Sequence, residues 1–450
     1  VLAQEPELLL LDELTTGLDV SLQASVLELL GRLYQEVGFS AVLVTHDLGI
    51  ARSLSSQVVI MREGRVNQRV GTDDLFDRRV SLSPYARRLL TLKDASDAMS
   101  DAPLAVPRAS AKRSSAVRLA AERVHKTFVS QAADRRALID INTVVAPGAC
   151  VALVGESGSG KTTLTRVLTG LTRPSRGCVR WDDRILGDLS VADARAVRRR
   201  RTVLFQNPYT SLNPAMTAQA AVAESLVRPG GRLSSVATEA QRRLAQVGLA
   251  ARADQPLGQL SGGERRRVGL LCALSTPGDV VVLDEPTAGL DAEHRASVID
   301  LIRTAQKDHP RTMLLVSHDI GFVLSVSDRV AVLYQGQIVE EAATSDFFRP
   351  NVPHHPYTQS LWDASRYVAG ADVPSGLVAG HLIAVTADFE RSADGHTQKN
   401  TGCPFRNRCP VYKADSDRWS LCESVAPVLH GDPTRRRIAC HGVSHGELDT

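Results

Sequence analysis

Features typical of nucleic-acid-binding and membrane-spanning proteins are scarce in this 450-residue sequence. Aromatic residues make up only 4% of it, and the formal net charge of +3 predicts no polyanion-binding surface. The basic run at residues 198–201 contains no aromatic residue, so we interpret it as a solvated helix end rather than a nucleic-acid patch. No apolar run approaches the roughly 18 residues that a membrane-spanning helix requires. These absences disfavour nucleic-acid partners and a membrane span within the sequence.

The sequence also lacks the closely spaced cysteine pairs of a zinc ribbon. Three of its seven cysteines are scattered, whereas four gather near the C-terminal end, at Cys403, Cys409, Cys422 and Cys440. In a chain expected in the cytosol, such a group favours metal binding over disulfide bonds. The four cysteines could bind a metal centre larger than a single ion, and the alternatives are that they bind zinc or that they remain thiols without metal.

The sequence VGESGSGKTT at residues 154–163 contains a complete G-x-x-x-x-G-K-[ST] phosphate loop. It follows an apolar run and precedes a helical pattern, which is the context that the motif needs. Backbone N–H groups of such a loop point at phosphate oxygens, the lysine reaches the β- and γ-phosphates, and the hydroxyl after it takes a Mg²⁺ position. The predicted nucleotide-binding residues are Gly155, Glu156, Ser157, Gly158, Ser159, Gly160, Lys161, Thr162 and Thr163.

An internal repeat divides the chain into two copies of one module. Residues 7–19 (ELLLLDELTTGLD) align with residues 279–291 (DVVVLDEPTAGLD) at a constant separation of 272 residues, as from Asp12 to Asp284. The same separation relates His46 to His318. The phosphate loop at residues 155–163 has no counterpart in the first copy. We therefore expect a first copy that is truncated at its N-terminal side.

Hydrophobic patterning predicts alternating β and α elements. Residues 8–11 have the form of a buried parallel strand that delivers two acids at its end, residues 20–34 that of a helix, and residues 41–44 that of a second strand. Residues 212–249 are mostly helical in pattern. Residues 93–117 are rich in Ala, Ser, Asp and Pro without a period, which predicts a flexible linker.

Two further segments could contact a nucleotide. Residues 260–264 (LSGGE) form a small polar turn before a helix, and free N–H groups at a helix start can receive phosphate charge. Phe128 stands before the phosphate loop in a β-type stretch, where it could stack on a purine ring or pack in the core.

Taken together, these residues resemble the ATP-binding cassette (ABC) ATPases. The second copy has the complete motif set, namely the phosphate loop, Gln206, the LSGGE signature, VVLDE at residues 281–285, AGLD at residues 288–291, and His318. The first copy has only Asp12, Glu13, residues 17–19 and His46. The resemblance implies an α/β fold of P-loop NTPase type, with a mixed β-sheet core plus a helical subdomain, in tandem and with a partial first copy.

The finer resemblance is to ATPases of the oligopeptide, dipeptide and nickel importers. FQNPYTSLNP at residues 205–214 and HPYT at residues 355–358 are similar to segments of that group. The resemblance to this group divides the chain into four parts: part of a first ATPase domain (1–92), a linker (93–117), a complete second domain (118–345) and a C-terminal extension (346–450). Similar cysteines in some members of the group hold a [4Fe-4S] cluster, which implies that role for the four clustered cysteines.

The resemblance also implies the roles of the site residues. Asp284 holds Mg²⁺ with Thr162 and Gln206, Glu285 activates or orients the attacking water, and His318 contacts the γ-phosphate. Asp291 and Asp12 belong to the two nucleotide sites, with Glu13 and His46 as the catalytic pair of the first. Because the signature of one module acts on the nucleotide of the other, Ser261, Gly262 and Gly263 serve the first copy's nucleotide.

The implied function is ATP hydrolysis that powers uptake of oligopeptides or dipeptides. Its partners are two integral-membrane permease subunits, an extracytoplasmic solute-binding protein and a second ABC module, with no nucleic acid. The expected location is peripheral, on the cytoplasmic face of the cell membrane. An ABC ATPase without a permease, of translation-factor type, and an importer of nickel or another small solute are the alternatives.

Overall fold

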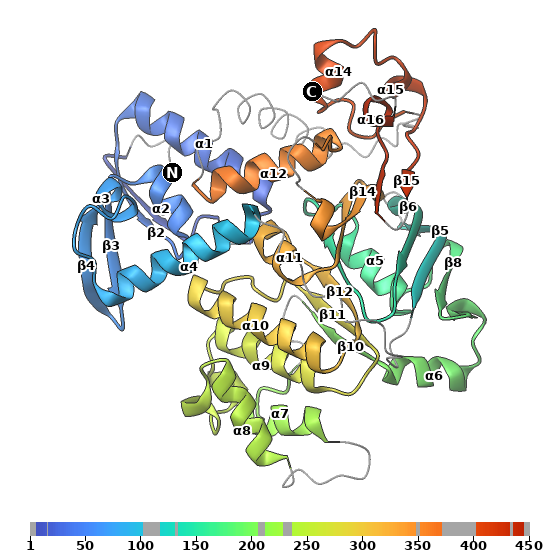
Figure 1. Ribbon diagram of the computed structural model, residues 1–450, viewed down its shortest axis with the longest axis horizontal. Coiled ribbons are helices and arrows are strands. Elements are labelled where there is room, and N and C mark those ends of the chain that lie inside the picture. The colour runs from blue at the N-terminus through green and yellow to red at the C-terminus, as the bar shows by residue number, and fades with distance from the viewer. Residues whose placement is uncertain are drawn as a thin grey trace.

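The computed structural model describes residues 6–15, 17–101, 118–130, 134–205, 212–227, 236–347, 352–370, 402–432 and 435–444. Its centre is a sheet whose described strands run in the order β10-β11-β12-β7-β13-β14-β16-β15 (Figure 1). The first five are parallel and the last three antiparallel. Their bounds are β7 (Cys150–Val154), β10 (Arg201–Leu204), β11 (Val280–Asp284), β12 (Thr312–Val316), β13 (Arg329–Tyr334), β14 (Gln337–Ala343), β15 (His430–Asp432) and β16 (Arg436–Ile438).

A second, antiparallel sheet covers one side of helix α5 (Lys161–Leu168), whose other side faces the main sheet (Figure 1). Its described strands are β5 (Leu119–Phe128), β6 (Arg135–Val145), β8 (Arg176–Trp181) and β9 (Arg184–Ile185). Leu164 and Leu168 of α5 are buried in one hydrophobic cluster together with residues of both sheets. The helix that follows the phosphate loop is therefore held between two layers.

The helical part of the second copy has a core of its own. It contains α7 (Ala218–Leu226), α8 (Ala237–Gln246) and α9 (Gly262–Ser275), of which α7 and α8 lie within residues 212–249, where helices were predicted. Other described helices are α6 (Val191–Arg199), α10 (Ala292–Asp308) and α11 (Ile320–Val326), and α12 (Pro356–Val368) stands near the start of the extension. Within the part of the chain that the structure describes, no helix is both long enough and apolar enough to cross a membrane.

The first copy repeats the second half of this fold. It contains β1 (Leu8–Asp12), α1 (Val20–Val37), β2 (Ser40–Val44), α2 (Leu48–Leu54), β3 (Gln57–Arg62), β4 (Arg65–Gly71), α3 (Thr72–Phe76) and α4 (Pro84–Asp101). β1 and β2 are parallel, as β11 and β12 are. The prediction that residues 8–11 are buried is wrong for Leu8 and Leu10, which are 54% and 70% exposed, because helix α1 covers only one face of this pair.

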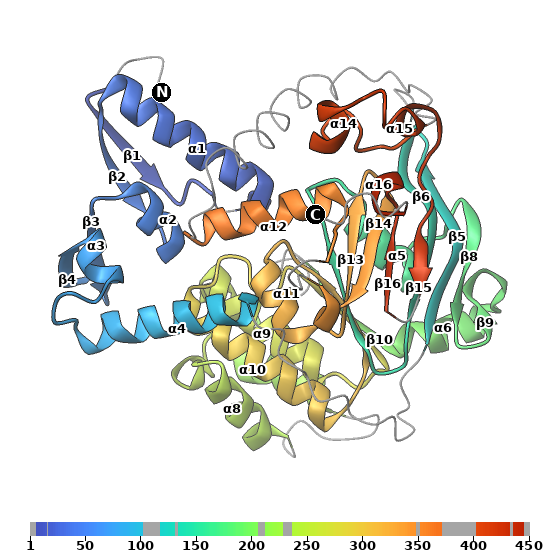
Figure 2. The ribbon, with the colours of Figure 1, turned by 45° about the horizontal axis from the view of Figure 1, so that its top comes forward.

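The two copies contact each other through exchanged helices (Figure 2). Helix α4 of the first copy packs against α10 and α11 of the second, and α12 of the second copy packs against α1 and α2 of the first. The repeat relates α4 to α12, α1 to α10 and α2 to α11, so the contact has the symmetry of a two-fold pair. An ion pair of 2.7 Å between Arg88 and Glu293 joins α4 to α10.

The linker predicted at residues 93–117 starts too early. Helix α4 continues to Asp101, because Leu, Lys, Ala and Met, all good helix formers, occur in its last three turns. Lys93 also donates a hydrogen bond of 2.7 Å to the carbonyl oxygen of Ala369, which ties this helix to the end of α12. Residues 102–117 lie outside the described residues.

The C-terminal extension is part of the main sheet rather than a separate unit. Strand β16 pairs with β14, and the extension adds the short helices α14 (Pro410–Ala414), α15 (Leu421–Ser424) and α16 (His441–Ser444). Glu340 of β14 is fully buried and accepts hydrogen bonds from Arg436, at 2.7 and 3.1 Å, and from the backbone of His355, at 3.0 Å. The extension predicted from residue 346 onward thus contributes strands to the sheet of the second copy.

Substitution of His355 is expected to change how stability depends on pH. Its ring Nδ1 accepts a hydrogen bond of 3.0 Å from Tyr357 N at the start of α12, and burial lowers the pKa of His355 to about 4. Below about pH 6.5 His355 is protonated in the unfolded chain but stays neutral in the folded chain. The free energy of unfolding therefore falls between pH 6.5 and 4, by up to about 3 kcal/mol. His355→Asn keeps an acceptor without a titrating ring. Urea unfolding at pH 7.5 and 5 should show a smaller loss for H355N, and equal losses would contradict the assignment.

Candidate nucleotide site

The phosphate loop lies where β7 ends and α5 begins, as predicted. Its backbone passes so close to neighbouring strands that only glycine fits at two positions. A Cβ atom on Gly155 would lie 2.2 Å from the carbonyl oxygen of Leu333, and one on Gly160 2.7 Å from that of Ala137. Both glycines also have positive φ, of 145° and 109°. Glycine is therefore required for the conformation of the loop. The other predicted nucleotide-binding residues lie along the loop and in the first turn of α5.

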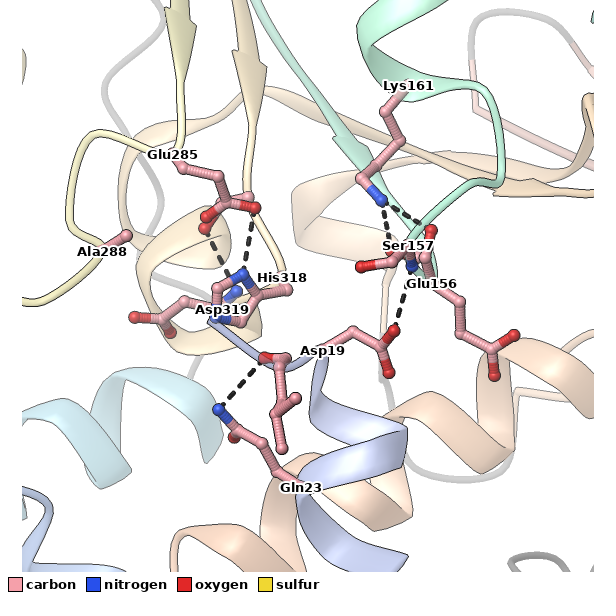
Figure 3. A network of polar contacts seen from close by, with 12 residues as sticks. Asp19, Gln23, Glu156, Ser157, Lys161, Glu285, Ala288, His318 and Asp319 are labelled. Atoms are coloured by element: carbon pink, nitrogen blue, oxygen red, sulfur yellow. Dashed lines mark hydrogen bonds and ion pairs between the residues drawn. The ribbon is translucent and has the colours of Figure 1, made fainter. Parts of the chain in front are cut away.

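Lys161 closes the loop at its own backbone. Its Nζ donates hydrogen bonds of 2.6 Å to Gly155 O and 2.8 Å to Glu156 O (Figure 3). Burial lowers the pKa of Lys161, while the charges of Glu285 and Asp19 act in the opposite direction. A desolvated ammonium group between backbone oxygens and acids is suited to binding phosphate oxygens.

Thr162 and Asp284, two of the predicted magnesium ligands, lie together. The Thr162 side chain is hydrogen-bonded to the Asp284 carboxylate, which is only 6% exposed at the end of β11. Burial and the charge of Glu285 raise the pKa of Asp284 to about 6, and the charge of Lys161 opposes this. A hydroxyl and a carboxylate are the oxygen donors that Mg²⁺ prefers, so these two residues fit the ion. Gln206, the third predicted ligand, lies outside the described residues.

Glu285 and His318 form a pair at the same edge of the sheet. Their side chains approach to 3.0 Å (Figure 3). Glu285 N also donates a hydrogen bond of 2.9 Å to Val316 O. Glu285 has a φ of 51°, a conformation that costs about 1–3 kcal/mol in a residue other than glycine and is concentrated at functional sites. Burial alone would lower the pKa of His318, but its hydrogen bond to Glu285 and the charge of that residue raise it.

The first copy builds the same pair in a more open setting. Glu13 has a φ of 45° and approaches His46 to 3.2 Å. The side chains of Glu13 and His46 are 46% and 37% exposed, against 10% and 25% for the second-copy pair. Asp12, which precedes them, is also exposed. The sequence around Glu13 therefore determines its backbone conformation and its contact with His46. How far the two side chains are exposed depends on the rest of the structure.

The signature turn is a capped helix start. Ser261 accepts a hydrogen bond of 3.2 Å from Glu264 N, and Glu264 accepts one of 2.8 Å from Ser261 N. This reciprocal pair explains why glutamate suits position 264. Ser261 and Gly262 are exposed and Gly263 is partly buried, so the tip that the resemblance assigns to the first copy's nucleotide is accessible.

Arg266 is a site residue that the motifs did not identify. From helix α9 its guanidinium donates hydrogen bonds to Glu285 O, at 3.1 Å, and Ala288 O, at 2.6 Å. It therefore links the signature helix to the turn that carries Glu285. An arginine one turn into a helix gives no sequence signal for such a contact.

Asp19 is a second residue that the sequence reasoning missed as a site residue. One carboxylate oxygen caps α1 by accepting from Leu22 N at 3.1 Å, and the other accepts from Ser157 N in the phosphate loop at 3.0 Å (Figure 3). Its repeat equivalent Asp291 caps α10, accepting from His294 N at 2.9 Å. The equivalence with Asp291, already a predicted site residue, was the available signal.

Asp19→Ser is expected to loosen the phosphate loop without weakening helix α1. Serine keeps the cap, but its shorter side chain does not reach Ser157 N. Hydrogen exchange of the peptide that covers residues 155–160 should be faster than in the unmodified protein by severalfold. Asp19→Ala, which removes the cap as well, should in addition speed exchange in the first turn of α1. Unchanged exchange at the loop in both variants would show that the contact does not hold it.

Phe128 stands at the end of β5 and is 46% exposed. Core packing, the alternative for this residue, is therefore wrong. Lys126 lies over its ring at 5.0 Å from the centroid. The exposed ring is compatible with stacking on a purine, which stays a prediction.

The four clustered cysteines gather in the extension. All seven cysteines carry free thiols, and among the four clustered ones Cys409, Cys422 and Cys440 all lie close enough to Cys403 to affect its pKa. Burial and the neighbouring thiols raise the pKa of Cys403 to about 12 and that of Cys409 to about 11. Among the described residues, no three acidic, cysteine or histidine side chains converge tightly enough to hold a single metal ion.

A glycine-shaped phosphate loop, a Thr–Asp pair and a strained Glu at neighbouring strand ends define a P-loop nucleotide-binding domain. Residues 138–288 match the family model of the ABC transporter, and residues 339–415 match that of the oligopeptide/dipeptide transporter C-terminal region. The chain belongs to the ATP-binding proteins of ABC transporters, in the group that carries this C-terminal region, as the motifs predicted.

Three curated relatives illustrate the similarity. A peptidoglycan transport ATP-binding protein, YejF, of Agrobacterium fabrum is 33% identical over 81% of this chain and 66% of its own length. The glutathione import ATP-binding protein GsiA of Pectobacterium atrosepticum is 31% identical over 81% of this chain and 62% of its own length. A putative peptide import ATP-binding protein of Brucella ovis is 33% identical over 68% of this chain and 91% of its own. The chain thus spans slightly less than two thirds of the first two relatives.

Proposed function

We propose that the second copy binds ATP with Mg²⁺ and hydrolyses it, and that this hydrolysis drives import of peptides across a membrane. The proposal is carried by one observation, the convergence of the phosphate loop, the Thr162–Asp284 pair and the Glu285–His318 pair at one edge of the sheet. Names of relatives that refer to import of peptides and glutathione support the direction of transport.

Each residue of the site has a role that follows from its charge. Lys161 and the loop N–H groups bind the β- and γ-phosphates, while Thr162 and Asp284, with Gln206, hold Mg²⁺, which supplies positive charge against the phosphate oxygens. Glu285 orients the attacking water and accepts its proton, and His318 holds the Glu285 carboxylate in place at 3.0 Å and faces the γ-phosphate. Phe128 stacks on the base.

Full activity requires a signature turn from a second module. This sequence carries one phosphate loop and one LSGGE turn, and in the proposal Ser261, Gly262 and Gly263 act on a nucleotide other than the one bound at Lys161. The chain alone should therefore hydrolyse ATP slowly unless two chains pair through residues 118–345. Turnover measured against protein concentration tests this point. Rapid turnover that does not depend on concentration would overturn it.

Two membrane permease subunits and an extracytoplasmic solute-binding protein complete the proposed transporter. A cavity of about 640 Å³ lies between the helical part and the main domain, lined by Leu226, Arg242, Arg243 and Gln246 on the side of α7 and α8. These four residues belong to the region that the resemblance assigns to permease docking. A hollow with both polar and apolar walls suits a helix from another subunit.

Co-purification separates the proposal from its alternatives. The protein expressed together with permease subunits of a peptide importer should be recovered with membranes and should raise uptake of labelled di- or oligopeptides in the presence of ATP. Recovery with ribosomes, or none with membranes, would favour an ABC ATPase without a permease. Uptake of nickel or another small solute in place of peptides would correct the substrate.

We further infer that the four cysteines hold a [4Fe-4S] cluster. Cys403 has the other three thiols in its neighbourhood, and four cysteines are the ligands that such a cluster takes. Anaerobically purified protein should be brown and contain iron and acid-labile sulfide. Colourless protein free of iron would overturn this assignment and leave zinc or free thiols.

A further inference from the structure

Glu156 in the phosphate loop is joined to the cysteine-bearing extension by a buried ion pair. Arg408 donates two hydrogen bonds to its carboxylate, Nη1 to Oε2 at 2.9 Å and Nη2 to Oε1 at 2.7 Å. The two side chains are only 12% and 17% exposed. Burial alone would lower the pKa of Arg408, but the hydrogen bonds and charge of Glu156 raise it. A bidentate, largely desolvated ion pair of this kind is among the strongest polar contacts in proteins.

Two other atoms of Glu156 are held as well. Its backbone N–H donates a hydrogen bond of 2.8 Å to the Tyr357 hydroxyl, and its carbonyl oxygen accepts one of 2.8 Å from Lys161. Tyr357 is fully buried in helix α12. Glu156 is thus connected on one side to the phosphate-binding lysine and on the other to two elements outside residues 118–345.

The segment that carries Arg408 is packed in place over aromatic rings. Phe405 contacts Tyr334 at a ring-centroid distance of 5.3 Å and Tyr357 at 5.4 Å. The Arg408 guanidinium lies 5.7 Å from the ring centroids of both Tyr334 and Phe405. Cys409 follows Arg408 directly in the chain. The position of the guanidinium therefore depends on the fold of the segment that bears the cysteines.

We propose that Arg408 is a positioning residue of the nucleotide site, through which the cysteine-bearing segment sets the affinity for ATP. The inference rests on the proposed binding of nucleotide at residues 155–163. A carboxylate in that loop would repel the phosphate oxygens, and Arg408 neutralises it, while Tyr357 and Lys161 hold the backbone of the same residue. Because Arg408 belongs to the extension, loss of that segment's fold leaves Glu156 as an unpaired charge beside the phosphates.

If Arg408 acts by neutralising the Glu156 carboxylate, the two residues should have different effects on the Kd for ATP when each is replaced. A contact that only supports the fold predicts no such difference. Arg408→Gln leaves the carboxylate unpaired and should raise the Kd for ATP about tenfold, which corresponds to about 1.4 kcal/mol. Glu156→Gln removes the repelling carboxylate and leaves the positive charge of Arg408 near the phosphates, so it should lower the Kd by about threefold. The double variant removes both charges and should bind ATP more tightly than Arg408→Gln and more weakly than Glu156→Gln. A contact that only supports the fold would instead weaken binding in both single variants.

The experiment is equilibrium binding of ATP with Mg²⁺ to the full chain, with thermal unfolding measured without nucleotide as a check of folding. Arg418→Gln, at an exposed arginine of the same extension, is the matched control and should not change the Kd. If Arg408→Gln fails to fold, Arg408→Lys serves in its place: it keeps the charge with fewer hydrogen bonds and should raise the Kd by about two- to threefold, and an unchanged Kd would count against the role of Arg408.

The outcomes separate this inference from the proposed function. If the unmodified protein binds no ATP, the proposed function fails. If it binds ATP and the Arg408 variants bind equally well, only the role of Arg408 is overturned. Equal weakening by Glu156→Gln and Arg408→Gln, without recovery in the double variant, would also overturn charge neutralisation.

Discussion

Glu285→Gln should lower ATP hydrolysis by at least about 100-fold while leaving ATP affinity within about twofold. Glutamine fills the same space in the left-handed position after β11 but cannot accept a proton from water, and a positioned base contributes roughly 10²–10⁴ in rate. The comparison is made by phosphate release at saturating MgATP, at the protein concentration where the unmodified chain turns over fastest.

The matched control for this variant is supplied by the repeat. Glu13→Gln makes the same change in the pair Glu13–His46, whose side chains are far more exposed and for which this sequence has no phosphate loop. It should change the rate of the chain by less than about twofold. A larger effect of Glu13→Gln than of Glu285→Gln would place the productive site in the first copy and contradict the roles proposed here.

Lys161→Ala should weaken ATP binding by about 10- to 100-fold. The ammonium group is buried and already held at the loop by Gly155 O and Glu156 O, so it is positioned for charged hydrogen bonds to phosphate, each worth about 1.5–3 kcal/mol. Isothermal titration with ATP and Mg²⁺ measures the change. Lys307→Ala, at an exposed lysine of α10, is the control and should leave the affinity unaltered. Unchanged affinity in Lys161→Ala would contradict nucleotide binding at this loop.

The two expected losses differ in kind. Loss of Lys161 acts on the bound ground state, whereas loss of the Glu285 carboxylate acts on the step in which water attacks. If ATP affinity and turnover both fell in each of the two variants, Lys161→Ala and Glu285→Gln, the phosphate loop and the end of β11 would be structurally coupled. The link from Arg266 to Glu285 O and Ala288 O gives a physical route for such coupling from the signature helix.

Sequence alone was enough to predict the candidate nucleotide site and to reveal the repeat. The phosphate loop requires glycine where β7 turns into α5, and the acids of the site come directly after an apolar strand, so both are local consequences of residue type. The correspondence of Asp12 and Glu13 with Asp284 and Glu285 was visible for the same reason. Both glutamates adopt the same left-handed conformation, because each copy has the same short-range sequence around it.

Only the tertiary structure decided which parts meet across long separations. The exchange of α4 and α12 between the copies, the contact of Asp19 with Ser157 N, and the pairing of Arg408 with Glu156 join residues more than a hundred positions apart. Helix α4 also continues past the predicted start of the linker, and β16 joins the main sheet beyond the predicted domain boundary. Such contacts depend on the summed packing of whole elements rather than on a local pattern, and the exposed face of β1 likewise depends on which elements are present to cover it.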